Sequence, residues 1–259
     1  MKHYGLLGYP LSHSFSVGYF SEKFRREHID ATYENFPLST IGRFSDLLKE
    51  YPDLSGLNVT IPYKEAIIPY LDTLDTQARV IGAVNVVQFK RNEKGALLLT
   101  GYNTDVIGFR ESIRPLIQAL KERFSACTDE LPFKALILGT GGASKAVFYA
   151  LKELGVESVC VSRKAAPSVL TYEALTAEVL EAHRIVINTT PLGMYPNMDG
   201  LPSLDYSSIG SCHLLYDVVY NPRMTAFMRM GVSRGALVKN GIDMLYLQAD
   251  ASWEIWNSE

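Results

Sequence analysis

Apolar positions along the chain follow two periods that alternate. Short apolar runs indicate strands, whereas apolar residues three or four positions apart indicate helices that bury one face. In the first hundred residues, the pattern predicts strands over 4–8, 31–36 and 57–61, and helices over 16–28, 41–51 and 73–81. Two further strand-like runs, 83–91 and 96–101, flank turn residues and predict an antiparallel hairpin. The beginning of the chain is therefore predicted to be an α/β unit.

The second half of the chain alternates in a different style. A long helical pattern over 104–124 continues despite Pro115, and a polar stretch over 125–132 predicts a boundary region. Short apolar runs without polar alternation predict strands at 135–138, 158–161, 185–188 and 214–219. Helices are predicted between them over 144–154, 172–182 and 225–234. Such strands are typical of a parallel sheet covered on both faces, which is the doubly wound arrangement.

The last segment, 242–256, has a helical pattern and no strand follows it. We therefore predict an α/β protein of two domains, with a Rossmann-like doubly wound second domain and a C-terminal helix that returns to the first domain. The predicted domains are residues 1–103 plus 238–259, and residues 104–237. An active site is expected in the cleft between them.

Composition narrows the classes of function. The formal net charge is −3, charged residues make up 20% and hydrophobic residues 47%, which is ordinary for a globular protein. The absence of a basic run argues against nucleic acid as a partner, and no signal-length or membrane-length apolar stretch occurs, so we expect a cytoplasmic protein without a membrane partner. The histidines and cysteines have no metal-ligand spacing, so no metal is predicted.

A glycine turn stands between the strand at 135–138 and the helix that follows it. Its residues are Gly139, Thr140, Gly141, Gly142, Ala143 and Ser144. Glycine at the first position permits a tight turn, glycine at the third lets the backbone approach a pyrophosphate, and the N–H groups of the helix start favour negative charge. Such a match can also be a turn without a ligand, but the strand and helix on either side favour a dinucleotide site.

The end of the next strand indicates which dinucleotide. An NAD site usually has a carboxylate there for the ribose hydroxyl, whereas a 2′-phosphate needs cations. This chain has Ser162, Arg163 and Lys164 at that point. The two basic residues favour NADP as the cofactor, the alternative being that they only end a loop.

Small hydrogen-bonding residues gather in four short segments of the first half, 12–16, 58–64, 82–85 and 101–105. Singly, each segment is more often a helix cap or a turn. Together they suit an anionic ligand with several hydroxyls. Ser14 and Ser16 are candidates to bind its carboxylate, and the candidates for its hydroxyls are Asn58, Thr60, Asn85 and Asp105.

These segments, in their order along the chain, resemble the shikimate dehydrogenase family. The resemblance rests on 58–60 with Pro62 and Lys64, 82–85, 103–105, 139–144, 188–194, 216–222, and 241–245 with Gln248. It covers most of the chain. It implies reversible NADPH-dependent reduction of 3-dehydroshikimate to shikimate, an oxidoreductase step of the chorismate pathway in aromatic amino acid biosynthesis.

The resemblance also implies roles for single residues. Lys64 and Asp105 would be catalytic. The residues that would contact shikimate are Ser14, Ser16, Asn58, Thr60, Asn85, Asp105, Tyr220 and Gln248. Those that would line NADP are Gly139, Gly141, Gly142, Ala143, Ser144, Ser162, Arg163, Lys164, Thr189, Val218 and Gly241.

The chemistry of ketone reduction gives an independent reason to expect a catalytic role for Lys64. Hydride transfer to a ketone creates an alkoxide, which needs a positioned acid. Lys64 can supply the proton, and Asp105 can hold its ammonium group and accept a substrate hydroxyl. The alternatives are a quinate/shikimate dehydrogenase with relaxed cofactor use and a non-catalytic homologue that senses shikimate. The sequence leaves a monomer and a homodimer equally open.

The chain departs from the usual family pattern at four positions. Val17 stands in place of a proline, Val106 and Asp243 stand where glycine is common, and Ser162 stands in place of an asparagine. These departures bear on cofactor affinity and substrate preference more than on the class of reaction.

Overall fold

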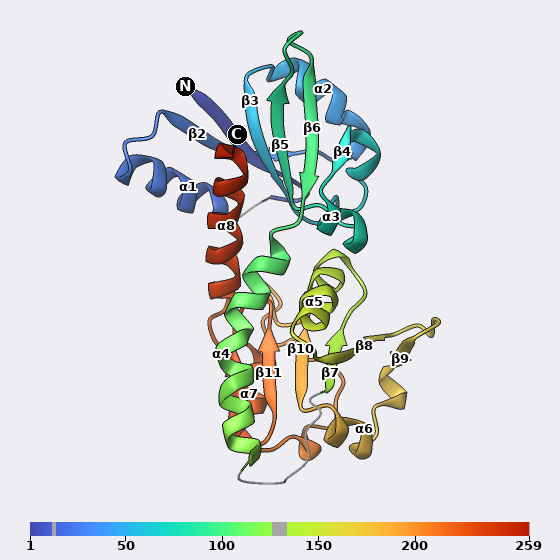
Figure 1. Ribbon diagram of the computed structural model, residues 1–259. Helices are drawn as coiled ribbons and strands as arrows, with labels where there is room; N and C mark the ends of the chain where they lie inside the picture. The colour runs from blue at the N-terminus through green and yellow to red at the C-terminus, as the bar shows by residue number, and fades with distance from the viewer. Residues whose placement is uncertain (12–13, 126–133, 259) are drawn as a thin grey trace. The chain divides into compact units, whose positions relative to one another are not determined.

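The computed structural model describes residues 1–11, 14–125 and 134–258, and the chain divides into two compact units (Figure 1). Unit 1 consists of Met1–Thr104 and Ala249–Glu259, and unit 2 consists of Asp105–Gln248. The C-terminal helix α8 (Ile242–Asn257) contributes residues to both. The boundary region predicted over 125–132 lies outside the described residues except for Ser125. Among the described helices, none combines the length and apolar character needed to cross a membrane.

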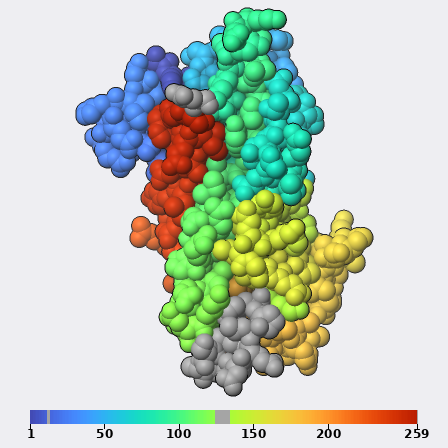
Figure 2. All heavy atoms as spheres, viewed as in Figure 1, coloured from blue at the N-terminus to red at the C-terminus, as the bar shows by residue number. Residues whose placement is uncertain are grey.

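Unit 1 contains a mixed sheet with the strand order β2-β1-β3-β5-β6-β4. Its strands are β1 (Lys2–Gly8), β2 (Ala31–Pro37), β3 (Leu54–Val59), β4 (Thr73–Leu74), β5 (Val86–Arg91) and β6 (Leu97–Tyr102). Strands β1, β2 and β3 are parallel, whereas β5 runs antiparallel to both β3 and β6. The predicted hairpin is therefore confirmed, and its exposed tip is the green end at the top of Figure 2.

Period-two alternation along the strands of unit 1 builds a core on each face of the sheet. Tyr4 and Leu6 of β1 belong to an aromatic core with Trp256, whereas Leu7 joins the core on the opposite face. Helix α1 (Phe15–Arg26) and the end of α8 supply the aromatic core. The opposite core includes residues of η1 (Ile41–Arg43), α2 (Phe44–Glu50), η2 (Ile68–Tyr70) and α3 (Thr76–Ile81).

Unit 2 contains a fully parallel sheet with the order β12-β11-β10-β7-β8-β9. Its strands are β7 (Lys134–Leu138), β8 (Glu157–Ser162), β9 (Val169–Thr171), β10 (Ile185–Asn188), β11 (Leu214–Asp217) and β12 (Leu237–Lys239). Counted from β7, this is the 3-2-1-4-5-6 order of a Rossmann fold. The chain moves outward in opposite directions from β7 and β10, so the topological switch point lies between these two strands.

Helices complete the doubly wound arrangement of unit 2. They are α4 (Asp105–Ser125), α5 (Gly142–Glu153), η3 (Tyr172–Ala174), α6 (Ala177–Ala182), η4 (Tyr206–Ser208) and α7 (Ala226–Ser233). Residues of α6, η4 and α7 pack against one set of strand residues, which includes Leu136 and Leu215. On α4, Phe109 packs edge-on against Tyr216 of β11, and Ser112 hydrogen-bonds the same tyrosine. The two-domain α/β class predicted from the sequence is confirmed.

Several element boundaries differ from the prediction. Thr73 and Leu74 form a short strand parallel to β6 instead of the start of a helix, because Asp75 caps α3 by accepting from two backbone N–H groups. The helix predicted over 172–182 is divided into η3 and α6, since the Thr176 side chain caps a new helix start. The edge strands β9 and β12 have three residues each, too few to produce a periodic signal.

Candidate active site

The glycine turn follows β7 directly at the topological switch point. Gly139 has φ +120°, a backbone conformation that L side chains rarely adopt, and a Cβ atom there would lie 2.7 Å from Thr189 Oγ1. Its N–H donates to Val161 of β8 (2.8 Å). Gly141 is the N-cap of α5 and has no side chain to occupy the first N–H groups of that helix. The turn thus presents backbone N–H groups where a dinucleotide phosphate binds in this fold.

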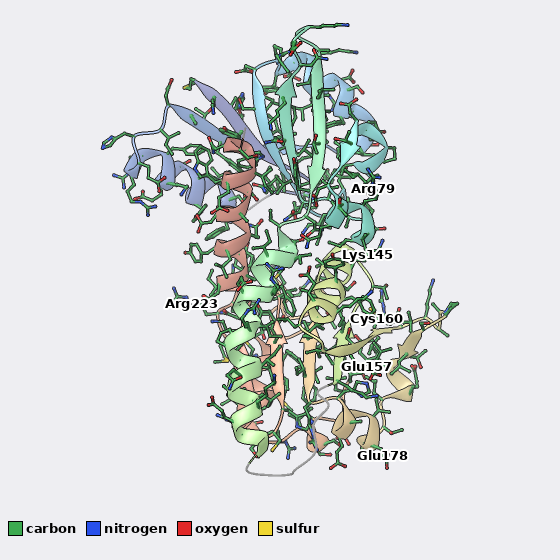
Figure 3. All side chains as sticks on the ribbon, viewed as in Figure 1. Arg79, Lys145, Glu157, Cys160, Glu178 and Arg223 are labelled. Atoms are coloured by element: carbon green, nitrogen blue, oxygen red, sulfur yellow. The ribbon has the colours of Figure 1, made fainter. Side chains whose placement is uncertain are left out.

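The remaining residues of the turn form the first turn of α5. Gly142 and Ala143 are half-buried, and Ser144 is buried with its hydroxyl donating to the Gly141 carbonyl (2.6 Å). Ser144 is therefore small enough for close packing of the helix on the sheet. Lys145, labelled in Figure 3, follows on the same helix and adds a positive charge to this end.

The three residues at the end of β8 lie at the surface of unit 2. Ser162 is the last residue of β8, and its hydroxyl accepts from the Lys164 N–H (3.3 Å). Arg163 and Lys164 are exposed. Arg163 is close enough to Tyr172 for its charge to counter the raised pKa that burial gives this tyrosine. The two cations are thus available to a solvent-borne phosphate group.

The loops after β10, β11 and β12 bring three more of the predicted cofactor residues to the C-terminal edge of the sheet. Thr189 donates its hydroxyl to the Leu138 carbonyl (2.7 Å) and lies beside Gly139. Val218 donates its N–H to the Asn188 carbonyl (3.0 Å). At Gly241, any side chain would collide with the Val218 carbonyl, 2.1 Å from an ideal Cβ. Residues 138–144, 189, 218 and 241 therefore form one surface within unit 2.

Asp217, the last residue of β11, is fully buried behind this surface. Its carboxylate accepts from Asn188 Nδ2 (3.0 Å), the Val219 N–H (3.0 Å) and the Thr225 hydroxyl (2.6 Å). Burial raises its pKa to about 6, although the three donors oppose the shift.

In unit 1, a buried hydrogen-bond network joins two of the predicted substrate residues, Asn58 and Asn85. Asn58 Nδ2 donates to Ser252 Oγ (3.0 Å) and to the Asn85 carbonyl (3.4 Å), and Asn58 Oδ1 accepts from the Tyr33 hydroxyl (2.8 Å). Asn85 Nδ2 lies 3.0 Å from Thr104 Oγ1, which also lies 3.2 Å from Ser252 Oγ. Ser16 is buried and lies close to Tyr33.

The network determines how the side-chain amide of Asn58 is oriented. The Asn85 carbonyl can only accept, so the amide nitrogen of Asn58 faces it and the amide oxygen faces Tyr33. Tyr33 therefore donates its single proton to Asn58. The buried hydroxyl of Ser14 has no hydrogen-bond partner among the described residues.

Lys64 lies in the turn after β3. Its backbone is fixed, since the Val84 N–H donates to the Lys64 carbonyl (2.7 Å) and the neighbouring Tyr63 hydroxyl donates to the Leu38 carbonyl (2.5 Å). Thr60, half-buried just after β3, is held by a bond from its N–H to the Leu7 carbonyl (2.8 Å). Thr60 and Lys64 therefore stand on a rigid segment of unit 1.

Three of the predicted substrate residues belong to unit 2. Asp105 is the first residue of α4 and is buried, with 5% of its surface exposed. Tyr220 follows β11, and burial raises the pKa of its phenol. Gln248 lies on α8 and donates to the Leu245 carbonyl (3.0 Å). The substrate residues proposed from the sequence are thus divided between the two units.

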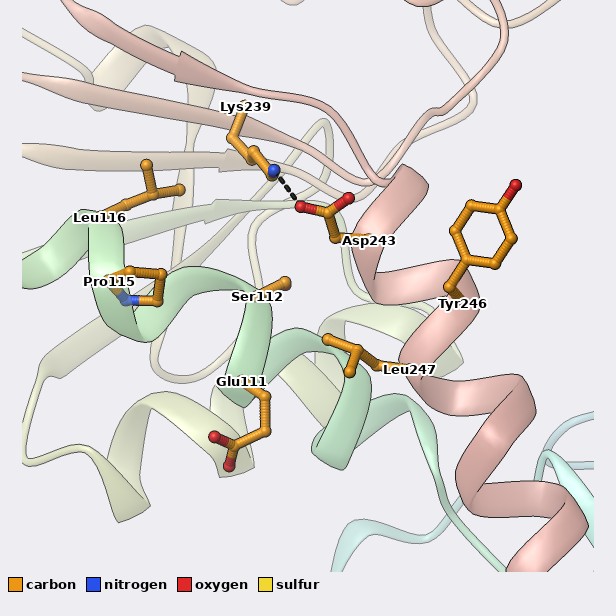
Figure 4. Close-up of a pocket in the computed structure, with 8 residues that line it drawn as sticks. All are labelled: Glu111, Ser112, Pro115, Leu116, Lys239, Asp243, Tyr246 and Leu247. Atoms are coloured by element: carbon orange, nitrogen blue, oxygen red, sulfur yellow. Dashed lines mark hydrogen bonds and ion pairs between the residues drawn. The ribbon is translucent and has the colours of Figure 1, made fainter.

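Asp243, one of the departures from the family pattern, has a local partner. It lies in the first turn of α8 and forms an ion pair with Lys239 of β12, drawn as a dashed line in Figure 4. A carboxylate at a helix start also interacts favourably with the helix dipole. The two residues line a surface recess with Glu111, Ser112, Pro115, Leu116, Tyr246 and Leu247.

Six residues that support these sites have no role predicted from the sequence. Tyr33, Thr104 and Ser252 hold the substrate residues of unit 1, and Asn188, Asp217 and Thr225 hold the cofactor loops of unit 2. A partial signal existed. The carboxylate at the end of the buried strand β11 and a serine on the apolar face of the last helix are polar residues at positions predicted to be buried.

Comparison with known proteins gives the family. Residues 6–87 match the family model described as the shikimate dehydrogenase substrate binding domain. The chain is 36% identical to the shikimate dehydrogenase (NADP(+)) of Clostridium beijerinckii, with 99% of this chain and 92% of that protein covered. The chain belongs to the shikimate dehydrogenase family. A second member, from Carboxydothermus hydrogenoformans, is 34% identical, with 97% and 90% covered.

Solved structures of this family have the same fold. Shikimate dehydrogenase 1 from Peptoclostridium difficile is 36% identical, with a TM-score of 0.81 and coverage of 99% of this chain and 91% of that chain. The enzyme from Thermus thermophilus in complex with NADP(H) and shikimate is 28% identical, with a TM-score of 0.81 and coverage of 99% and 94%. Quinate dehydrogenase from Corynebacterium glutamicum in complex with NAD is 25% identical, with a TM-score of 0.81 and coverage of 99% and 93%.

Proposed function

We propose that this member of the shikimate dehydrogenase family catalyses the reversible NADPH-dependent reduction of 3-dehydroshikimate to shikimate. The observation that carries the proposal is the glycine turn at the switch point of a Rossmann-ordered sheet, followed by two exposed cations at the end of the next strand. Family membership over nearly the whole chain supports the choice of substrate.

The residues of unit 2 fit NADP. Gly139, Gly141 and the first turn of α5 would bind the pyrophosphate, and Ser162, Arg163 and Lys164 would bind the 2′-phosphate. Thr189, Val218 and Gly241 would line the remainder. When bound, NADPH supplies the hydride.

Substrate recognition would come from polar groups of both units. We assign the carboxylate of shikimate to the hydroxyl of Ser14, which has no hydrogen-bond partner among the described residues, with Ser16 beside it. Thr60, Asn85, Tyr220 and Gln248 would bind the ring and its hydroxyls. Because Asn58 uses both ends of its amide within unit 1, its contribution would be mainly to hold its neighbours.

Lys64 would move the proton of the reaction. In the direction of reduction, its Nζ atom donates a proton to the oxygen of the carbonyl as that oxygen gains negative charge. In the reverse direction the neutral amine takes the proton from the shikimate hydroxyl. Asp105 would accept a hydrogen bond from a neighbouring hydroxyl and so orient the ring.

Activity measured with NADP and NAD against shikimate and quinate tests the proposal. We expect turnover of shikimate with NADP, and Lys64→Ala to lower kcat by about 10²-fold or more, as the loss of a general acid does. Lys90→Ala, an exposed lysine of the same unit, is the matched control and should retain full activity. Wild-type protein that does not oxidise shikimate with NADP contradicts the proposal.

The same measurements separate the alternatives. A preference for quinate or NAD would identify a quinate/shikimate dehydrogenase, the activity suggested by the likeness to the Corynebacterium enzyme. Binding of shikimate without NADPH formation would identify a sensor. A cytoplasmic location stays a prediction, which fractionation of cells tests.

A further inference from the structure

The three hydrogen-bond partners of the Asp217 carboxylate among the described residues are all donors. Thr225 Oγ1 accepts from the Met228 N–H (3.2 Å) at the start of α7, so its own proton points to Asp217 Oδ2 (2.6 Å). Asn188 Oδ1 accepts from the Thr190 N–H (3.1 Å), which fixes the amide so that Nδ2 faces Asp217 Oδ1. The backbone N–H of Val219 completes the set. A carboxylate, which only accepts, is the group that satisfies all three donors.

The network reaches the predicted cofactor surface through Asn188. Asn188 Oδ1 also accepts from the Thr190 hydroxyl (2.6 Å), and the Asn188 carbonyl accepts from the Val218 N–H (3.0 Å). The two chain neighbours of Thr189, Asn188 and Thr190, are therefore both fixed by hydrogen bonds. The Thr189 hydroxyl lies against Gly139. The position of Thr189 depends in this way on a carboxylate of the next strand.

We propose that Asp217 is a positioning residue for the dinucleotide, which through Asn188 and Thr225 holds Thr189 beside the glycine turn and Val218 beside Gly241. It lies behind the surface, and its effect passes through the two loops it joins. The proposal rests on the proposed function, because it takes this surface to be the NADP site.

Asp217→Asn keeps the shape of the side chain but turns a donor toward the Thr225 hydroxyl, whose proton then has no acceptor. Loss of a hydrogen bond to a charged group corresponds to a change of about tenfold in affinity. We therefore expect Kd for NADPH, measured by nicotinamide fluorescence, and KM for NADP to rise about tenfold in D217N. KM for shikimate in D217N should differ from the wild-type value by less than about twofold.

A second variant and a double variant test the route of the effect. Thr225→Val should weaken NADPH binding, whereas Thr225→Ser should retain it. The double variant D217N/T225V should bind NADPH no more weakly than D217N, because both substitutions remove the same Thr225–Asp217 hydrogen bond. Asp205→Asn is the matched control. Asp205 also accepts from serine hydroxyl and backbone groups, but at the start of η4, and its loss should leave NADPH affinity unchanged.

The outcomes are distinct. NADPH affinity unchanged in D217N or T225V, additive effects in the double variant, or a proportional rise of both KM values overturns the positioning role while the proposed function stands. Wild-type protein that binds neither NADPH nor NADP overturns both. If D217N does not fold, the comparison of T225V with T225S decides the question.

Discussion

At the scale of the residue, the buried polar groups of this chain differ in whether they have hydrogen-bond partners. Tyr33, Asn58 and Asp217 are buried and their polar atoms are partnered, whereas the hydroxyl of Tyr4 is buried in the aromatic core without a partner among the described residues. A buried hydroxyl without a hydrogen bond costs free energy that a partnered one does not.

Tyr4→Phe should therefore stabilise unit 1 by about 1 kcal/mol, since it removes an unpaired polar atom and keeps the ring. Trp256 stacks on Tyr4 with ring centroids 4.8 Å apart. The only two tryptophans of the sequence, Trp253 and Trp256, are both in unit 1, so their fluorescence in a urea titration reports on this unit. Tyr33→Phe, which removes a partnered hydroxyl, should lower stability. A destabilised Y4F variant would contradict the assignment of an unpaired hydroxyl.

Asp217 should make stability depend on pH in a direction opposite to that of most carboxylates. Burial raises its pKa from 3.8 to about 6, so between these values the folded protein holds a proton that the unfolded chain has released. The free energy of unfolding should therefore fall as pH rises through this interval, by about 3 kcal/mol for a shift of this size. D217N should lack this component, as measured by urea unfolding followed by circular dichroism.

Asp205 provides the contrast for this measurement. Hydrogen bonds from the Ser207 side chain and backbone lower its pKa, so its stabilising effect is present at neutral pH and is lost as pH falls. D205N should therefore reduce the acid sensitivity of the protein. Equal pH profiles for wild type and D217N would show that Asp217 titrates normally.

At the scale of the element, the strand β7, the glycine turn and α5 form the unit that would bind a phosphate. Local sequence is sufficient to predict it, because an apolar run, a glycine turn and a helix follow one another directly. The two glycines of the turn have different roles, and substitution separates them.

Gly139→Ala should destabilise unit 2 by about 1–3 kcal/mol and abolish NADPH binding, since its φ is +120° and its Cβ would lie 2.7 Å from Thr189 Oγ1. Gly141→Ala should leave stability nearly unchanged, because φ is −84° and, apart from its chain neighbours, no described residue has an atom within 4 Å of the added Cβ. It should nevertheless weaken NADPH binding, since the methyl group would face the pyrophosphate. Thermal unfolding and NADPH titration check both variants. Normal NADPH affinity in G141A would show that the pyrophosphate lies elsewhere.

At the scale of the whole molecule, α8 contributes residues to both units. Substitutions at different positions of this helix can therefore test one unit at a time. Trp256 fills the space above Gly56, where a Cβ would lie 2.4 Å from its indole nitrogen, and donates to the Val87 carbonyl (3.1 Å). Tyr246, on the part of α8 that belongs to unit 2, is 44% exposed.

Trp256→Ala should therefore destabilise unit 1 by about 3–5 kcal/mol, the usual cost of removing a buried aromatic ring. KM for shikimate should rise, while NADPH affinity stays within about twofold of wild type, because the predicted cofactor residues are in unit 2. Unfolding followed by Trp253 fluorescence and NADPH titration are the measurements. Tyr246→Ala should have little effect on the stability of unit 1 or on NADPH affinity. A large loss of NADPH affinity in W256A would contradict the independence of the two sites.

The sequence by itself determined the elements with strong periodicity and the motifs that are local. The long helix α4, the hairpin β5–β6, the buried strands β7 and β10 and the glycine turn all follow from residues close together in the chain. The short edge strands β9 and β12 did not, because three residues carry no period and their partners are distant in sequence.

Only the tertiary structure decided which polar groups meet. Tyr33, Asn58 and Ser252 come from three separate elements, and so do Asn188, Asp217 and Thr225. It also decided that the amide oxygen of Asn58 faces Tyr33 and that its nitrogen faces Ser252. The physical reason is that the direction of a hydrogen bond depends on every donor and acceptor around it, and these are brought together by packing between strands and helices distant in sequence.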